Sequence, residues 1–446
     1  MAEQPSHEVG ADQIFFSTTD AKGVITDANS VFTELARFDR SELIGAPHNI
    51  IRNPMMPGGA FKLMWDNLED GKPWVGFVAN QAKDGSRYNV LATVSPMEDG
   101  SYLSVRTRPN DPDLAEALWK TYASVREQEQ KYRADTGASK ADAAAWSEGP
   151  LMDAVHGLGY DTYTSFMEWL LPHEMKLWEE NNPRPYNAPT EGNLAELAAR
   201  VSDLLAEEEV WTNRQDSLTD LGAMLIDGVN ALEENNAVSR TVADEMKRVE
   251  GAGELTEDEL IPLQVGLRMG DIVEEYIAGL RDLFYELNIS TKNTRFKVAL
   301  ARLQTQTVGR FVEDLAKGAD EVSAIRVLCA ALATETMDMS REIHHHQMLL
   351  NRAKRRISTV ISLIALPQMA IQSWRADVEG SASAGKAQDL IHSVADSVDS
   401  MNSLIERLKS VVEQCEKMEP GHGPEALVDI VSDIDRMASG IAVNAG

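Results

Sequence analysis

The chain has 446 residues, and its 42 basic and 71 acidic side chains give it a net charge of -29 at pH 7. This charge argues against a nucleic-acid partner, because binding a phosphate backbone requires a positive surface. The length predicts two or three folded modules, since one domain usually takes about 100–200 residues. A composition that is 43% hydrophobic and 25% charged is ordinary for a folded soluble chain.

Residues 1–12 are expected to form a flexible tail, and residues 13–110 a small sheet domain. Turns that begin with Asp and end with Gly separate short apolar runs, which we predict to be strands. The runs are Phe15–Thr19, Val24–Thr26, Val75–Ala82, Arg87–Val94 and Tyr102–Arg108. The last three are expected to form an antiparallel meander, since apolar and other side chains alternate with the period of two that a strand requires.

Between the first two runs and the last three, residues 28–65 contain helix formers interrupted at Gly45–Pro47 and Pro54–Gly59. Short helices are therefore expected over one face of the sheet. Such a layout leaves a pocket between the helices and the concave sheet face, where a domain of this type can hold a small ligand.

The rest of the chain is predicted to be helical. Helices are expected over Asp111–Asp135 and Ala138–Trp178, the second with an interruption near Gly157–Tyr160. The prolines within Asn181–Thr190 cannot continue a helix, so a module boundary is placed there. Residues 111–190 are interpreted as a helical connector and residues 191–446 as a helical bundle or coiled-coil region.

Apolar residues in this last region recur at steps of three and four, as in helices that pack on other helices. One seam runs through Val308, Val312 and Val322 and then shifts register from Ile325 onward. Because such a shift changes the supercoil locally, we expect bundle helices here and not one perfect rod. Breaks in the helices are expected at residues 251–253, at Pro262 and at Pro367.

No segment is expected to span a membrane. The most apolar run, Ile357–Ile371, is shorter than the roughly 20 apolar residues that a span needs. The N-terminus lacks the basic start and apolar core of a secretory signal. We therefore expect a cytoplasmic protein. Cys329 and Cys415 are expected to be buried thiols, because two distant cysteines in apolar helical surroundings suggest neither a disulfide framework nor a zinc site.

No catalytic or metal-binding residues are predicted. The chain has no glycine-rich phosphate loop, no kinase ATP-lid pattern, no nucleophile elbow and no zinc-binding His-Glu-x-x-His helix. The run His344–His346 does not predict a metal site, because consecutive helical residues point about 100° apart. The basic run Arg352–Arg356 is interpreted as a solvated helix face. The chain is thus not expected to be an enzyme.

A resemblance to a known family lies in the N-terminal domain. Leu43–Pro54 reads Leu-Ile-Gly-Ala-Pro-His-Asn-Ile-Ile-Arg-Asn-Pro, and it is followed by Ala60–Trp65 and Gly71–Asn80. These stretches resemble the PAS sensor domain of bacterial aerotaxis receptors. The resemblance implies an α+β PAS fold, with a five-stranded antiparallel sheet and short helices, and flavin adenine dinucleotide (FAD) as a cofactor.

Residue by residue, the resemblance implies that Asn29, Arg52, Trp65 and Asn80 bind the cofactor. An Arg can meet a phosphate with paired donors, and an Asn can meet a ring amide edge with a donor and an acceptor. Other interpretations stay open: a surface salt bridge for Arg52, a packed aromatic for Trp65, and backbone caps for both Asn residues. Three positions depart from the family pattern, namely Asn53 for His, Met55 for Asp and Asn89 for Trp.

A second, weaker resemblance lies in the helical region. Leu287-Asn288, Val308–Phe311 and Ala319–Val322 follow the order of elements in the signalling tip of methyl-accepting chemotaxis receptors, with a different spacing. This resemblance implies a chemoreceptor-like output, association into a homodimer or higher oligomer, and a chemotaxis kinase or adaptor protein as a partner.

Two functions remain open from the sequence. The first is a soluble sensor of redox state or oxygen, of the aerotaxis or chemotaxis type, that signals through its helical bundle. The second is a cofactor-free PAS scaffold for dimerisation and interaction, which the departures at Asn53, Met55 and Asn89 favour.

Overall fold

The computed structural model describes residues 5–182, 186–319, 321–417 and 425–444. The chain divides into two compact units. The first unit contains Met1–Thr212, Arg295–Ser340 and Gly423–Gly446, and the second contains Asn213–Thr294 and Arg341–His422. The division differs from the predicted module boundary near residue 190, because the long helices contribute segments to both units.

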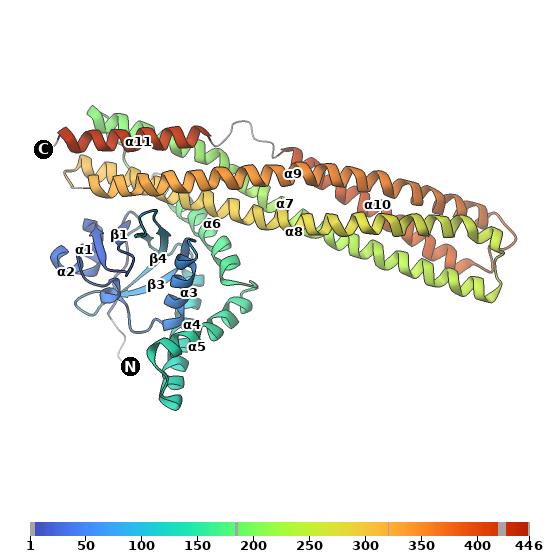
Figure 1. The fold of residues 1–446 in the computed structure, drawn as a ribbon, viewed down its shortest axis with the longest axis horizontal. Coiled ribbons are helices and arrows are strands. Elements are labelled where there is room, and N and C mark those ends of the chain that lie inside the picture. The colour runs from blue at the N-terminus through green and yellow to red at the C-terminus, as the bar shows by residue number, and fades with distance from the viewer. Residues whose placement is uncertain (1–4, 183–185, 320, 418–424, 445–446) are drawn as a thin grey trace. The chain divides into compact units, whose positions relative to one another are not determined.

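The N-terminal part of the first unit is a five-stranded antiparallel sheet, as predicted (Figure 1). Its strands lie in the order β2-β1-β5-β4-β3. The strands are β1 (Phe15–Thr19), β2 (Ile25–Ala28), β3 (Trp74–Gln81), β4 (Arg87–Pro96) and β5 (Tyr102–Thr107). The last three form the expected meander, and β1 pairs with β5 to join the first hairpin to it.

The three turns of the sheet use the same chemistry. The carboxylates of Asp20, Asp84 and Asp99 each accept a backbone N–H two residues further on, at 2.8 to 3.0 Å. The glycine that follows each Asp has a positive φ, between 75° and 86°, which other residues adopt only with strain. These turns are therefore encoded locally.

Short helices cover the inner face of the sheet. They are α1 (Ser30–Ala36), α2 (Arg40–Leu43), the 3-10 helix η1 (His48–Ile51) and α3 (Gly58–Glu69). At one end of this face Phe15 stacks on Phe32, with ring centroids 4.8 Å apart, and Tyr88 packs against Phe15. Aromatic rings thus fill one end of the inner face.

The described part of the expected tail is not free of the domain. Ser6 forms a β-bridge with Arg87, and Val9 is buried. His7 donates its backbone N–H to Arg87 and contacts Ser86 and Leu35 through its ring. The prediction of a flexible tail is wrong for residues 5–12, because backbone pairing and apolar burial hold them. Residues 1–4 lie outside the described part.

The connector forms three helices, α4 (Pro112–Thr136), α5 (Lys140–Gly157) and α6 (Tyr163–Asn181), close to the predicted bounds. α4 and α5 hold the start of α3: the Glu129 carboxylate accepts the N–H of Gly58 at 2.6 Å, and Ser147 Oγ accepts that of Gly59 at 2.9 Å. A carboxylate is favourable there because the free N–H groups at a helix start carry partial positive charge. The connector residues 183–185 lie outside the described part.

Five further helices follow: α7 (Gly192–Ala252), α8 (Glu257–Ala316), α9 (Val322–Glu379), α10 (Gln388–Lys417) and α11 (Glu425–Asn444). The break at residues 251–253 is confirmed. Those at Pro262 and Pro367 are wrong, since both prolines lie inside helices. Buried Ile364 and Ile371 on either side of Pro367 keep α9 packed through it.

The region of the register shift near Ile325 is divided between two helices, as expected for a bundle and not one rod. α8 ends at Ala316, Gly318 has φ of 94°, and α9 begins at Val322. The register shift in the sequence therefore marks a turn between two helices. Residue 320, within the second resemblance, lies outside the described part.

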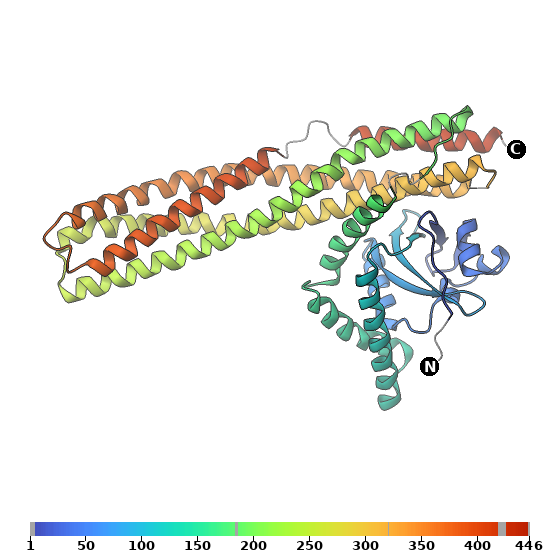
Figure 2. The same cartoon turned by 180° about the vertical axis from the view of Figure 1, so that it is seen from behind.

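The second unit is built from four helical segments of α7, α8, α9 and α10, which run side by side in both views (Figures 1 and 2). Its core contains Leu225, Phe284, Ile357 and Leu404, among others. Cys415 is buried there, and Cys329 is buried in the first unit, as predicted. Burial raises the pKa of both thiols to about 12.

One stretch of α9 is long and apolar enough, by length and composition, to cross a membrane. This differs from the expectation that no segment qualifies. In the structure 33% of the stretch is buried. Its buried residues include Ile357, Val360, Ile364 and Ile371, whose steps of three, four and seven place them on one helix face. That pattern is typical of a helix packed in a bundle.

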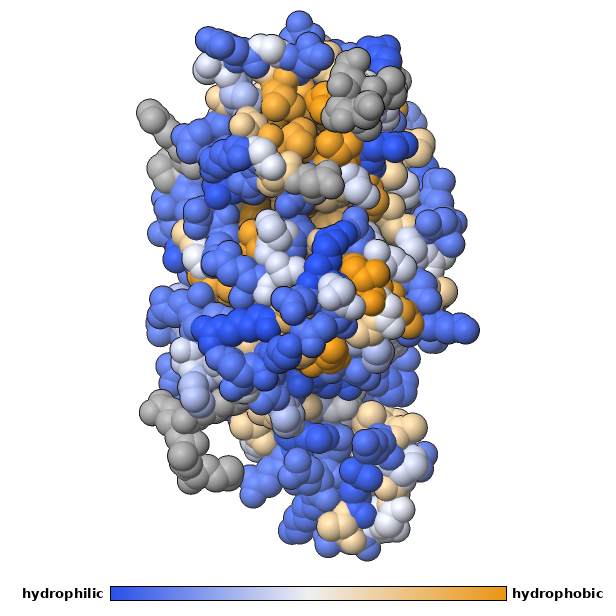
Figure 3. Space-filling view, turned by 90° about the vertical axis from the view of Figure 1, so that its left-hand side faces the viewer, coloured by the Kyte–Doolittle hydropathy of each residue, from blue (hydrophilic) through white to orange (hydrophobic). Residues whose placement is uncertain are grey.

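Hydrophilic side chains dominate one face of the first unit (Figure 3). The face drawn in Figure 3 is mostly hydrophilic, and apolar side chains gather in patches, the largest near its upper end.

Candidate functional site

A cavity of about 280 Å³ lies between the inner face of the sheet and the segment η1–α3. Every second residue of the meander faces it: Trp74, Val78 and Asn80 from β3, Ala92 and Val94 from β4, and Tyr102, Ser104 and Arg106 from β5. The expected pocket is therefore present. Its volume is close to the lower limit of about 300 Å³ for ligand pockets.

The charge of the cavity wall is opposite to that of the chain. Three cationic residues, Lys22, Arg52 and Arg106, line it, and no Asp or Glu does. The chain as a whole has 71 acidic and 42 basic residues. The wall is otherwise rich in aromatic and apolar side chains, so the cavity suits an aromatic ligand with negative charge.

Arg106 is the deepest of the three cations, with 7% of its surface exposed. Its guanidinium lies over the Phe15 ring, 4.7 Å from the centroid, and one Nη contacts His48 Nε2 at 3.1 Å. Nε has no hydrogen-bond partner, and among the described residues no carboxylate pairs with this cation. Burial lowers the pKa of Arg106 to about 10.

His48 is held neutral beside this cation. Burial lowers its pKa well below the usual range, and the positive charges of Arg106 and Arg52 lower it further. Its Nε2 therefore accepts from Arg106, and Ser17 Oγ lies 3.1 Å from the same nitrogen. The structure places His48 in the cavity wall.

Three of the four predicted site residues meet at this cavity. Asn80 is 2% exposed, and its Nδ2 has no acceptor in the described structure. Arg52 is exposed at the mouth, with its guanidinium 3.6 Å from the centroid of the Phe61 ring. Trp65 is half-buried and packs edge-on against Tyr102, with centroids 5.4 Å apart. Of the open alternatives, a surface salt bridge for Arg52 does not form within the described residues.

Asn29 does not face the cavity. It is the N-cap of α1: its Oδ1 accepts the N–H groups of Phe16 and Phe32, both at 3.1 Å. Its Nδ2 donates to the Ile14 carbonyl at 3.0 Å. These hydrogen bonds use both the oxygen and the nitrogen of the amide, so Asn29 fixes β1 against α1. Asn29 therefore acts as a backbone cap, which was the alternative to cofactor binding.

Two of the three departures from the family pattern lie away from the cavity. Asn89 pairs with Ala79 and points to the outer face of the sheet, where Met55 also lies. Asn53 is buried behind the cavity wall, where its amide contacts the Asn80 carbonyl and the Met55 N–H. The departures therefore change the surroundings of the cavity more than its lining.

The comparisons with known proteins concern this same part of the chain. Residues 12–107 match the family model described as PAS domain. Over 123 residues the chain is 40% identical to the aerotaxis receptor of Escherichia coli (strain K12), covering 26% of this chain and 24% of that receptor. Over 84 residues it is 30% identical to a nitrogen fixation regulatory protein of Klebsiella pneumoniae, covering 19% and 17% respectively.

The N-terminal domain is a PAS domain. A solved structure of a light-oxygen-voltage domain, studied with a flavin analogue, is 25% identical, covers 24% of this chain and 85% of that one, and has a TM-score of 0.22. The chain spans about a quarter or less of the curated relatives' length.

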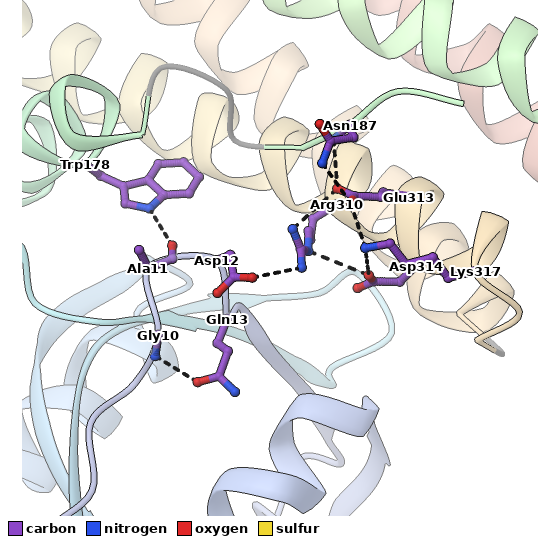
Figure 4. A network of polar contacts seen from close by, with 10 residues as sticks. All are labelled: Gly10, Ala11, Asp12, Gln13, Trp178, Asn187, Arg310, Glu313, Asp314 and Lys317. Carbon is purple, nitrogen blue, oxygen red and sulfur yellow. Dashed lines mark hydrogen bonds and ion pairs between the residues drawn. The ribbon is translucent and has the colours of Figure 1, made fainter. Parts of the chain in front are cut away.

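Polar contacts tie the PAS domain to the helices of the first unit (Figure 4). Asp12, just before β1, pairs with Arg310 of α8 at 3.3 Å, and the Trp178 indole of α6 donates to the Ala11 carbonyl at 3.4 Å. Beside them Phe16, on the outer face of β1, packs edge-on against Phe311 of α8, with centroids 5.8 Å apart. The strand that carries the N-terminus is thus held by two helices.

A second connection starts at the C-terminal end of β5, which lies beside the start of β1. The buried Glu174 carboxylate of α6 accepts the backbone N–H groups of Asn110 and Asp111, at 2.6 and 3.1 Å. Burial raises the pKa of Glu174, and these hydrogen bonds limit the rise. One helical turn or so further along α6, Glu179 pairs with Arg302 of α8. β5, which carries Arg106, is therefore linked to α6 and through it to α8.

Arg106 and Glu174 were missed from the sequence. Arg106 had a usable signal: it shares the inward alternation of Tyr102 and Ser104, so a cation is predicted on the concave face. Glu174 had none, because an acidic residue on an amphipathic helix is ordinary.

We expect Arg106→Met to stabilise the ligand-free protein. A pKa of about 10 corresponds to roughly 3 kcal/mol of unfavourable free energy for the buried cation, at about 1.4 kcal/mol per pH unit. Methionine removes that cost in a similar volume, so the free energy of unfolding should rise by about 1–3 kcal/mol in urea titrations. Arg52→Met at the exposed mouth serves as the control and should change it by less than about 0.5 kcal/mol. A destabilised Arg106→Met protein would contradict this account.

Proposed function

We propose that this chain is a signal-transduction protein whose PAS cavity binds a flavin nucleotide and that reports redox state or oxygen through its helices. The observation that supports the ligand is the cavity wall without carboxylates, in which Arg106 is buried and unpaired. A buried cation without a carboxylate partner lowers stability, because it loses its hydration and no ion pair compensates. Residues that lower stability in this way are typical of ligand sites.

The cavity fits the ring part of a flavin better than a whole dinucleotide. About 280 Å³ of space, bordered by Trp74, Trp65 and Val78, can enclose a flat aromatic system. Asn80 Nδ2 and Arg106 Nε are free donors for ring carbonyl oxygens. Lys22 and Arg52 line the same cavity and are available to phosphate groups. FAD, which the family resemblance implies, is the proposed form.

The flavin, when bound, would supply the redox chemistry, since its ring takes up and releases electrons. Arg106 provides the response of the protein. A guanidinium is held more strongly by a charged than by a neutral acceptor, so Arg106 would move with the charge in the cavity. His48, kept neutral, can follow as its acceptor.

A displacement of Arg106 would reach the helices along β5. Asn110 lies four residues further along the chain, and Glu174 holds its N–H and that of Asp111. Any shift of β5 along its axis therefore strains these bonds or moves α6. A signal needs a differential free energy of only about 1–3 kcal/mol, similar to the cost of disturbing hydrogen bonds to a charged group.

The remaining parts of the proposal concern the whole protein. We place it in the cytoplasm, without catalytic activity of its own, as a homodimer or higher oligomer that acts on a chemotaxis kinase or adaptor through a chemoreceptor-like bundle. The aerotaxis receptor match over the PAS region supports the signalling role, and the long four-helix second unit supports an output through helices.

Flavin binding is tested by incubating the purified full chain with FAD, removing the unbound cofactor and recording the absorbance spectrum. We expect the bands of oxidised flavin in stoichiometric amount. Asn80→Leu and Arg106→Met each remove a donor and should weaken binding by about tenfold or more. Asn89→Ala, on the outer face, is the control and should bind normally. A colourless protein would instead support the cofactor-free scaffold.

The link through Glu174 is tested by limited proteolysis of the flavin-loaded chain before and after reduction. We expect the cleavage rate within residues 111–190 to change with redox state. Glu174→Gln keeps the shape of the side chain but replaces one acceptor with a donor, and it should abolish that change while leaving the flavin spectrum intact. Glu180→Gln, exposed on the same helix, should behave as the parent. Identical cleavage of the oxidised and reduced parent would refute the proposed signal.

A further inference from the structure

A second cavity lies inside the helical bundle of the second unit, far along the chain from the PAS domain. It has a volume of about 460 Å³ and is bordered by α7, α8, α9 and α10. That volume is within the range of about 300–1000 Å³ for small-molecule sites, which bundles commonly form between their helices.

Small side chains on α8 create this space. A Cβ added at Gly266 would lie 2.8 Å from Cγ1 of Ile371, so this glycine sets how closely α8 and α9 approach. One turn further on, a Cβ added at Gly270 would meet nothing within 4 Å. Gly270 therefore faces open space, and Pro367 of α9 lines the same cavity.

A buried polar group in the wall has no partner. Asn235 of α7 is 7% exposed, and its Oδ1 accepts no hydrogen bond within the described structure. A buried acceptor left unpaired costs about 1–3 kcal/mol. Its position in the cavity wall marks a place where a ligand with an N–H or O–H donor would recover that free energy.

The charged residues at the cavity are mainly cationic. Arg240, Lys247 and Arg268 line it, against one carboxylate, Glu250. Lys247 contacts Asp244 at 3.4 Å, but neither arginine has a carboxylate partner among the described residues. In a chain with 71 acidic residues and 42 basic ones, two arginines at one cavity favour an anionic ligand.

The rest of the wall is apolar. Leu267, Ile364, Ile371 and Met401 contribute side chains from three helices. A fully polar metabolite would leave these groups without contacts, whereas an aromatic or aliphatic body would fill the space between them.

We infer that this cavity binds a small amphipathic organic anion that also carries a hydrogen-bond donor. The anion would meet Arg240 and Arg268, the donor would meet Asn235 Oδ1, and the apolar body would lie against Ile364 and Ile371. This site is separate from the PAS cavity and does not depend on the flavin. A ligand there would contact all four helices of the unit and so stabilise their packing.

The test uses the fluorescent probe anilinonaphthalene sulfonate, which combines a sulfonate, an aryl N–H and fused rings. The full chain is titrated with the probe, and each variant is compared with the parent so that any binding at the PAS cavity cancels. We expect Gly270→Leu, which fills the space, to remove one saturable binding component. Arg240→Gln, at an exposed position, should weaken that component by about tenfold.

Gly251→Leu is the control, because this glycine is also exposed to open space but does not line the cavity. It should bind the probe as the parent does. Circular dichroism and thermal melting show whether Gly270→Leu is folded. If it is not, the affinity of Arg240→Gln for the probe tests the site independently. Equal stoichiometry and affinity in the parent and in both variants would overturn the inference, as would a parent that binds no probe.

Discussion

The first unit depends on a cation buried without a carboxylate. Arg106 lies in the concave face of the PAS sheet, with only the Phe15 ring and the neutral His48 as close partners. Removing such a charge from water costs several kcal/mol unless a partner offsets it. No residue of the cavity wall can, because none is acidic. We therefore interpret the PAS domain as a ligand site, because its cavity holds a positive charge that no residue of the wall neutralises.

The strand that carries Arg106, β5, also connects the cavity to the helices. β5 carries Arg106 on one side and ends at the two N–H groups that Glu174 of α6 holds. At the same end of the sheet, where β1 begins beside the end of β5, Asp12 and Phe16 contact Arg310 and Phe311 of α8. The PAS domain is therefore attached to α6 and α8 at the end of its central strands that carries Arg106, which is where a change inside the cavity can reach them.

How much of this could be predicted depends on the range of the interactions. The strands and turns were predictable, because each Asp–Gly turn is closed by its own side chain. Pro367 was misread as a break, because tertiary packing decides whether a helix continues through a proline. At the site, Asn80 lines the cavity, whereas Asn29 does not, because its amide is used entirely by neighbouring backbone groups.

The most direct measurement is a crystal structure of the full chain grown with excess FAD. The account predicts flavin ring density inside the PAS cavity, with ring oxygens within hydrogen-bond distance of Arg106 and Asn80. Water alone in that cavity, with Arg106 turned toward a carboxylate of its own chain, would contradict it.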